Sequence, residues 1–173
     1  MKKVEKAKTA PIKKTMTTKT SIYDIKINSL EGKSIDLSKF IGNHILFVNV
    51  ASECGFTNQY KDLQKLSDTY KNLTIIGVPC NQFGGQESGD SSQIKTFCER
   101  NYGVNFLLTE KIEVKGNKQH PLYEWLTKKE FNGKKSSTVK WNFQKYLINK
   151  DGDLVDYFYS ITKPFSSKII KHL

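Results

Sequence analysis

The sequence predicts an α/β fold in which helices flank a central mixed sheet. Two apolar runs, residues 45–48 and 73–78, have the length and composition of buried strands. Between them, residues 57–70 carry apolar side chains at helical spacing. A strand, a helix and a second strand in this order form a unit whose two strands lie parallel and side by side.

The segment before the first apolar run predicts an N-terminal β-hairpin. Tyr23, Ile25 and Ile27 alternate with polar residues, which is typical of a half-buried strand. Residues 31–33, Glu-Gly-Lys, predict a turn, and residues 34–37 predict a short returning strand.

A polar, glycine-rich loop follows the second apolar run. Residues 79–89 are long for a connection and rich in amide side chains, and such loops often carry function. Asp90 and Gln93 predict a capping box that starts the next helix. Helical periodicity then places Cys98 on the inner face of this helix, as a core residue.

The C-terminal half predicts further helices and strands. Together with the first half, their order is typical of a thioredoxin-like α/β fold. In order, they are an edge element at 106–108, a helix from Pro121, a charged loop at 128–137, a strand at 139–148, its hairpin partner at 154–159 and a last helix at about 165–173.

The net charge of +11 suggests a nucleic-acid partner, but its distribution argues against one. Residues 1–20 hold seven lysines against one acid, Glu5, a net +6, and they lack periodicity. Only one of the 28 basic residues is an arginine, Arg100, whereas base and phosphate recognition favours arginine. We therefore expect a disordered basic tail over 1–20, a single domain over 21–173 and no nucleic acid. A module whose tail binds nucleic acid or an anionic membrane is the alternative outside enzymes.

The location of the protein is predicted to be the cytoplasm. No apolar run approaches the length of a membrane span, so we expect no stable membrane insertion. The first residues lack the apolar region of a secretory signal. Organelle targeting by the acid-poor tail stays open, although transit segments are usually rich in arginine and serine, which this tail lacks.

Three cysteines, Cys54, Cys80 and Cys98, stand in the chain. An odd count without a secretory signal does not describe a secreted disulfide scaffold. Their spacings match no zinc pattern, so no metal is expected. The sequence therefore favours redox chemistry in a reducing compartment.

Cys54 lies between a predicted strand end and a predicted helix start. The unpaired N–H groups and partial positive charge of a helix N-terminus favour a thiolate, and Gly55 lets a small substrate approach. In a parallel sheet, the Cys54 loop and residues 79–89 lie beyond the same edge. A buried cysteine that packs as a small apolar residue is the alternative, and position alone leaves both open.

Three separated motifs carry a resemblance to a known family. They are Asn-Val-Ala-Ser-Glu-Cys-Gly at 49–55, Pro-Cys-Asn-Gln-Phe-Gly-Gly-Gln-Glu at 79–87 and Trp-Asn-Phe-Gln-Lys at 141–145. In this order and spacing they resemble the glutathione peroxidase family, in its cysteine-containing, thioredoxin-dependent branch. The resemblance runs from about residue 21 to the C-terminus.

The resemblance implies a catalytic set. Cys54 stands at the position of the peroxidatic cysteine, Gln86 matches the catalytic glutamine, and Trp141 and Asn142 match the Trp-Asn pair. The chemistry agrees, because thiolate attack on a peroxide needs an ionised sulfur and hydrogen-bond donors to the departing oxygen. Amide and indole N–H groups donate without titrating near neutral pH.

The resemblance also implies a resolving cysteine. Peroxide would convert Cys54 to a sulfenic acid, and Cys98 would then form a disulfide with it, to be reduced by thioredoxin or glutathione. Disulfide Cα atoms must come within roughly 7 Å, so we expect residues 91–103 to be only marginally stable. Cys80 matches a cysteine frequent in the family and receives no required role.

The resulting prediction is a peroxidase that reduces hydrogen peroxide and organic or lipid hydroperoxides during oxidative stress. It needs no cofactor beyond its thiol reductant. Ser88 replaces the proline usual in the family, which alters rigidity more than chemistry, and the short 127–140 loop favours a monomer. A peroxide sensor that relays oxidation to a partner is one alternative. A disulfide reductase is another, but it normally needs Cys-x-x-Cys, which Cys54 lacks.

Overall fold

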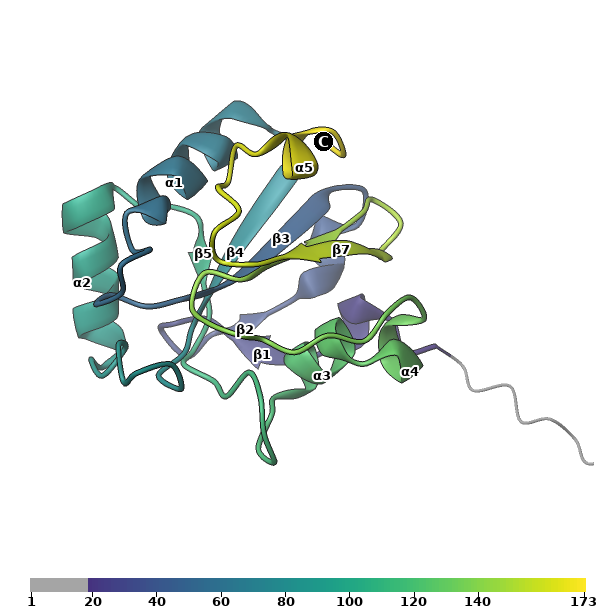
Figure 1. Cartoon of the computed structure of the whole chain (residues 1–173), viewed down its shortest axis with the longest axis horizontal. Helices are drawn as coiled ribbons and strands as arrows, with labels where there is room; N and C mark the ends of the chain where they lie inside the picture. Colours follow the sequence, from purple (N-terminus) through teal and green to yellow (C-terminus); the bar gives the residue numbers. More distant parts are fainter. Residues whose placement is uncertain (1–18) are drawn as a thin grey trace, which may run out of the picture.

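The computed structural model describes residues 19–173 and confirms the predicted α/β fold (Figure 1). Five strands form a mixed sheet in the order β5-β4-β3-β6-β7, and β1 (Ile27–Asn28) pairs with β2 (Ser34–Ile35) in a separate antiparallel hairpin. The other elements are η1 (Ile22–Asp24), η2 (Leu37–Phe40), β3 (His44–Val50), α1 (Gln59–Thr69), β4 (Leu73–Pro79), α2 (Ser91–Tyr102), β5 (Leu107–Leu108), α3 (Pro121–Thr127), α4 (Lys129–Asn132), β6 (Lys145–Ile148), β7 (Leu154–Phe158) and α5 (Ser167–Ile170).

The central strand, β3, is buried along all seven of its residues. It pairs in parallel with β4 from His44 opposite Leu73 to Val50 opposite Pro79, and antiparallel with β6. Because β3 and β4 run parallel and end together, the loops that follow them leave the same edge of the sheet. This register brings the segment of Cys54 beside the glycine-rich segment, as predicted.

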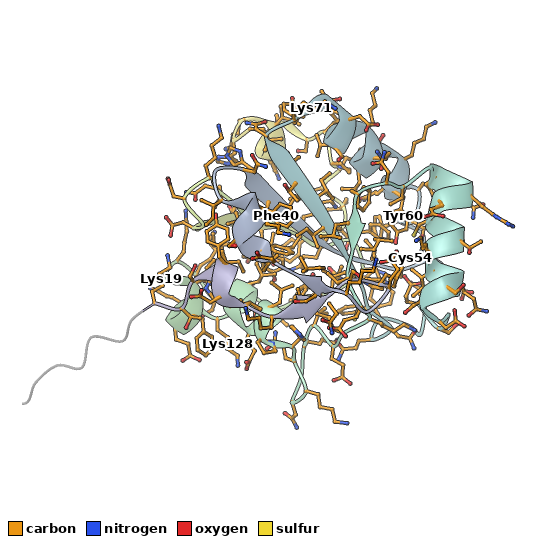
Figure 2. All side chains as sticks on the ribbon, turned by 180° about the vertical axis from the view of Figure 1, so that it is seen from behind. Lys19, Phe40, Cys54, Tyr60, Lys71 and Lys128 are labelled. Carbon is orange, nitrogen blue, oxygen red and sulfur yellow. The ribbon has the colours of Figure 1, made fainter. Side chains whose placement is uncertain are left out.

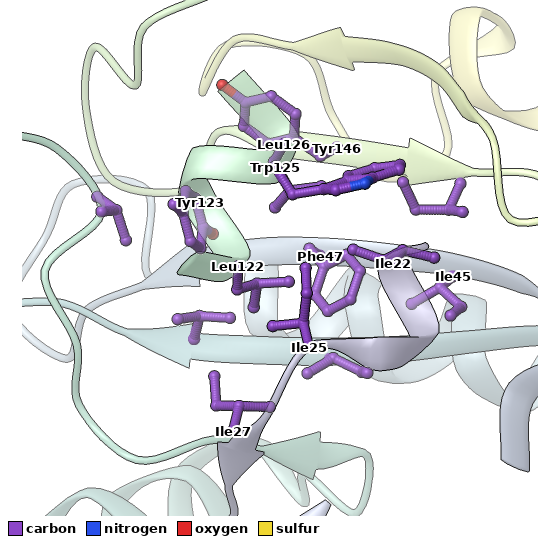
Figure 3. Packing of buried hydrophobic residues seen from close by; sticks show 14 of the residues in the cluster. Ile22, Ile25, Ile27, Ile45, Phe47, Leu122, Tyr123, Trp125, Leu126 and Tyr146 are labelled. Atoms are coloured by element: carbon purple, nitrogen blue, oxygen red, sulfur yellow. The ribbon is translucent and has the colours of Figure 1, made fainter. Parts of the chain in front are cut away.

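The two faces of β3 bury two separate apolar clusters. Ile45 and Phe47 point into a cluster with the N-terminal hairpin, η1 and α3 (Figure 3). Leu46, Val48 and Val50 point into the other, beneath α1, α2 and α5. Alternation along a fully buried strand thus makes three layers, with α1 and α2 on one side of the sheet and α3 and α4 on the other (Figure 1).

The predicted strands of the N-terminal hairpin are wrong in extent. The side chains alternate between buried and exposed as expected, but residues 22–24 form the 3-10 helix η1. The Ser21 side chain accepts the N–H of Tyr23, and the Asp36 side chain likewise accepts the N–H of Ser38 at the start of η2. These local side-chain hydrogen bonds replace the hydrogen bonds between paired strands. As a result, β1 and β2 contain only two residues each.

Three further predictions need correction. The strand expected over 139–148 begins only at Lys145, because Phe143 adopts a left-handed backbone with φ of 63°. The charged loop at 128–137 contains the short helix α4, which ends at Gly133 with φ of 72°. The last helix is confined to α5, four residues long.

The predicted tail over 1–20 falls mostly on residues 1–18, which lie outside the described residues. Lys19 and Thr20 are already attached to the domain. The Lys19 ammonium pairs with Asp153, and the Thr20 carbonyl accepts the indole N–H of Trp125 at 2.7 Å. Within residues 19–173, no helix has the length and apolar character that crossing a membrane requires.

Candidate functional site

Cys54 lies in a tight turn between β3 and α1, partly buried against the cluster beneath α1 and α2 (Figure 2). Its N–H donates to Thr57 Oγ1 at 3.0 Å, and that hydroxyl donates to the Ala51 carbonyl at 2.9 Å. The N–H of Phe56 donates to the Cys54 sulfur at 3.4 Å. A donor aimed at the sulfur stabilises negative charge on it. This donor belongs to the turn, since α1 begins only at Gln59, later than predicted.

The Cys54 loop (residues 51–58) is bonded directly to the glycine-rich loop (residues 80–89). The N–H of Glu53 donates to the Gln86 carbonyl at 3.1 Å. The N–H and hydroxyl of Ser52 both donate to Glu87 Oε1, at 3.1 and 2.6 Å. The predicted convergence of these loops is therefore confirmed, and their main chains hold Gln86 beside the residue that precedes Cys54.

Two consecutive glycines turn Gln86 back toward the Cys54 loop. Gly84 and Gly85 both adopt left-handed backbones, with φ of 70° and 64°. A side chain is strained in this region, so glycine is the residue that permits the turn without cost. At Gly84, an added Cβ would also meet the Gln86 side chain at 3.4 Å.

Asn142 fixes the orientation of the Gln86 amide. Asn142 is fully buried, and its Nδ2 donates to Gln86 Oε1 at 2.9 Å. Its own carbonyl accepts the hydroxyl of Ser160, which anchors the turn to the segment after β7. Because the oxygen of Gln86 is taken as an acceptor, its amino group is the end that remains to donate.

The turn that carries Trp141 is held by Asn49, near the end of β3. Asn49 Nδ2 donates to the Trp141 carbonyl at 3.0 Å, and its carbonyl accepts the N–H of Phe143 at 2.6 Å. The Trp141 side chain is 38% exposed and lies against Phe83, with 5.7 Å between ring centroids. Asn49 received no role from the sequence, although a polar residue inside an otherwise apolar strand was the feature that could have marked it.

Cys98 lies in the middle of α2 with no exposed surface and a free thiol. This confirms the core position that helical periodicity predicted. Burial raises the pKa of the thiol to about 11. Cys80 is also free and buried, its thiol faces Gln82 Oε1 at 3.5 Å, and burial raises its pKa too. The three cysteines therefore differ, and Cys54 alone combines partial exposure with a backbone donor at the sulfur.

Lys145 is a second polar residue that sequence reasoning did not assign. Its side chain is fully buried in β6, and its Nζ donates to the Phe143 carbonyl at 2.7 Å. No ion pair to Lys145 occurs within residues 19–173. Lys145 thus tethers the left-handed residue next to Asn142 and is a buried basic group without an acidic partner.

Replacing Lys145 with methionine is expected to flatten the pH dependence of stability. Burial lowers the pKa of Lys145 from 10.5 to about 7, so between these values the unfolded chain binds more protons than the native one. The wild-type free energy of unfolding should therefore rise by about 2 kcal/mol from pH 7 to pH 9 through this group. Urea unfolding at both pH values measures the rise, and an equal rise in Lys145→Met would contradict the assignment.

Replacing Gln86 with glutamate tests the donor role of its amide. The carboxylate keeps the oxygen that accepts from Asn142 and loses the amino group. We expect the rate constant for peroxide reduction to fall by roughly 10²-fold, the usual loss for one donor to a developing oxyanion. Rapid-mixing kinetics with hydrogen peroxide measure it, and Gln82→Glu, on the same loop, serves as the control.

Metal ligands do not gather in this region. Over the part of the chain that the structure describes, no three histidine, cysteine or acidic side chains are placed to hold one ion. The candidate site residues are a thiol, two amides and an indole, and hydrogen bonds hold the loop of Cys54, the Gln86 amide and the main chain at Trp141.

Comparison with known proteins gives consistent matches over most of the chain. The family model described as Glutathione peroxidase matches residues 22–127. A glutathione peroxidase from Lactococcus lactis is 44% identical over 146 residues, 83% of this chain and 92% of its own length. A hydroperoxy fatty acid reductase from Synechocystis is 45% identical over 152 residues, 83% of this chain and 89% of its own.

Comparison with solved structures supports the same family and fold. The crystal structure of T. cruzi GPX1 matches with a TM-score of 0.67 and 33% identity, over 88% of this chain and 92% of that one. A disulfide oxidoreductase and a thioredoxin-like protein, 15% and 14% identical, share the fold alone and confirm that it is thioredoxin-like. The chain belongs to the glutathione peroxidase family.

Proposed function

We propose that the protein reduces hydrogen peroxide and organic hydroperoxides through Cys54, with Gln86, Asn142 and Trp141 as the supporting set. The observation that carries the proposal is the hydrogen bond from Asn142 to the Gln86 oxygen, which leaves the Gln86 amino group free to donate. The Glu53–Gln86 main-chain bond fixes this amide beside the Cys54 loop.

The first step is attack of the Cys54 thiolate on one peroxide oxygen. An S–O bond forms, the O–O bond breaks, and the sulfur becomes a sulfenic acid while water or an alcohol leaves. Negative charge develops on the departing oxygen, so N–H donors fixed in advance lower the barrier. Gln86 and Trp141 supply such donors, and neither changes its charge near neutral pH.

The second step is proposed to join Cys54 to Cys98 in a disulfide that a thioredoxin-type dithiol then reduces. Both cysteines contact the same apolar cluster beneath α1 and α2, which supports the pairing. Cys98 is fully buried in the middle of α2, so the helix has to open locally to deliver its sulfur. The opening is the structural reason to expect weak protection of residues 91–103 in the oxidised protein.

The proposal further includes lipid hydroperoxides as substrates, a monomeric state and a cytoplasmic location. The name of the Synechocystis relative, a hydroperoxy fatty acid reductase, supports fatty acid hydroperoxides as substrates. The 128–137 segment supports a monomer, because Asn132 folds it back on the domain through bonds to the Trp125 and Lys135 carbonyls. Size-exclusion chromatography with light scattering tests the oligomeric state.

A coupled turnover assay tests the proposal. Hydrogen peroxide and a fatty acid hydroperoxide are each supplied with thioredoxin plus its reductase, or with glutathione plus its reductase, and NADPH consumption is followed. We expect turnover of both peroxides, faster with thioredoxin. Cys80→Ser serves as the matched control and should behave as wild type. Absence of turnover with every pair would contradict the proposal.

A further inference from the structure

Glu87 is a buried carboxyl group that the mechanism above does not use. The residue is 1% exposed, and its N–H donates to Asn81 Oδ1 at 2.9 Å. Its Oε1 accepts both bonds from Ser52, in the Cys54 loop. Its Oε2 is buried and has no hydrogen-bond partner among residues 19–173. A buried carboxyl oxygen left without a donor is costly, so its presence calls for an explanation.

Four charged or titratable groups, each on a different segment, interact with Glu87. Cys98 on α2 and Tyr60 on α1 lie near enough for the Glu87 charge to raise the pKa of both. Glu53 in the Cys54 loop and Lys111 after β5 act on Glu87 itself, the first raising its pKa and the second lowering it. Among these neighbours, Cys98 is the residue that has to lose a proton in the proposed second step.

A cavity of about 300 Å³ opens beside this group. Glu87 and Ser52 line it from the two loops, and Ile94 and Phe97 line it from α2. Ile94 lies one helical turn before Cys98 on the buried face of α2. Glu87 therefore stands between the Cys54 loop, to which Ser52 ties it, and the helix that carries the second thiol.

We propose that Glu87 is the base that accepts the proton of the Cys98 thiol when the Cys54–Cys98 disulfide forms. The proposal rests on the function proposed above, in which Cys98 attacks oxidised Cys54. The unpartnered Oε2 is the oxygen that takes the proton.

The step balances without a further reactant. The S–H bond of Cys98 breaks and its proton moves to Glu87. The thiolate attacks the Cys54 sulfur, an S–S bond forms, and the S–O bond of the sulfenic acid breaks. The departing hydroxide takes the proton from Glu87 and leaves as water. Cys98 is oxidised, the Cys54 sulfenic acid is reduced, and Glu87 returns to its carboxylate.

The charge balance of the cluster explains why a local base is needed. A thiol with a pKa of about 11 is ionised to a very small extent at neutral pH. While α2 is closed, loss of this proton to solvent would place a thiolate beside a carboxylate, two negative charges in a buried site. Transfer to Glu87 keeps one negative charge in the cluster until α2 opens.

The same burial sets the pH range of the step. Desolvation raises the pKa of Glu87 to about 7, so the fraction present as a base rises through neutral pH. The rate of disulfide formation in wild type should therefore increase with pH, with a midpoint near 7.

The test compares wild type with Glu87→Gln, which keeps an oxygen for Ser52 and cannot take a proton. Reduced protein is mixed rapidly with one equivalent of hydrogen peroxide, quenched with an alkylating reagent, and its sulfenic acid and disulfide forms are counted by mass spectrometry. We expect Cys54 oxidation at the wild-type rate, disulfide formation slowed by roughly tenfold or more, and a flattened pH profile. Glu87→Asp, which restores a carboxylate, should recover the pH profile.

Glu99→Gln is the matched control, because Glu99 is an exposed carboxylate on α2 whose charge also raises the pKa of Cys98. It should keep the wild-type pH profile. Equal disulfide rates in Glu87→Gln and wild type would overturn the proposal, as would equal slowing of both steps, which indicates positioning alone. Absence of any Cys54–Cys98 disulfide in wild type would instead refute the second step of the proposed function.

Discussion

Replacement of Cys54 by serine is expected to lower the rate constant for peroxide reduction by roughly 10³-fold or more. Serine differs from cysteine by one atom and fits the same turn, so the hydrogen bonds of Thr57 and Ala51 should remain. Its hydroxyl ionises far less readily than a thiol and is a poor nucleophile toward peroxide oxygen. In the proposed site, Gln86 and Trp141 would then have no departing peroxide oxygen to stabilise.

Single-turnover consumption of hydrogen peroxide measures this effect. Cys80→Ser is the control, because Cys80 is fully buried and its thiol already faces a hydrogen-bond acceptor, Gln82 Oε1, that a hydroxyl can use. Activity above a few per cent in Cys54→Ser would show that another group attacks the peroxide. Loss of activity in Cys80→Ser with an intact fold would show the same.

Replacement of Cys98 by serine is expected to stop thioredoxin-dependent turnover after one cycle. The sulfenic acid at Cys54 would form normally, since the hydrogen bonds of the Cys54 turn do not involve Cys98. No internal disulfide could then form for thioredoxin to reduce, so steady-state NADPH consumption should fall by roughly 10²-fold or more. Glutathione, a small thiol, can attack the sulfenic acid directly, so turnover with glutathione should persist.

The measurement is the number of peroxide molecules consumed per protein with thioredoxin present. One per chain followed by a stall is the expected result for Cys98→Ser. Continued wild-type turnover would assign the resolving role elsewhere, with Cys80 as the remaining cysteine. Circular dichroism of the reduced variant verifies that α2 persists when the buried thiol becomes a hydroxyl.

Much of the fold could be predicted because its elements are specified locally. The apolar runs that became β3 and β4 allow no other placement than burial, and a strand–helix–strand order makes them parallel. The capping box of Asp90 and Gln93 is confirmed with both of its hydrogen bonds, at 2.8 Å each. Patterns of this kind depend on residues a few positions apart, which a sequence displays directly.

The parts of the fold that were predicted wrongly depend instead on contacts between residues far apart in the sequence. A strand was expected through Trp141 and Asn142, but Asn49 and Lys145 hold this segment in a turn with Phe143 in a left-handed backbone. No local pattern predicts φ above zero at a phenylalanine. The late start of α1 has a similar cause, since the Thr57 hydroxyl bonds back to Ala51 and shapes the turn around Cys54.

The candidate site also has parts that the sequence predicts and parts that depend on distant contacts. Cys54, Gln86, Trp141 and Asn142 stand in motifs that mark them as candidates, and the order of the strands predicts that the loops of Cys54 and Gln86 meet. Only the family resemblance linked Trp141 and Asn142 to these loops. The hydrogen bond that orients the Gln86 amide could not be predicted, because it joins side chains 56 positions apart. Glu87 and Lys145 were missed for another reason, since their burial and shifted pKa values arise only from tertiary packing.

The central claim is that neutral N–H donors surround the peroxide that the Cys54 sulfur attacks. A crystal structure of the Cys98→Ser variant after exposure to peroxide tests it most directly, because the Cys54 oxygen is then trapped on the sulfur. We predict that the Gln86 amide and the Trp141 indole each donate to this oxygen at about 3 Å. A trapped oxygen with both donors more than about 5 Å away would contradict the account.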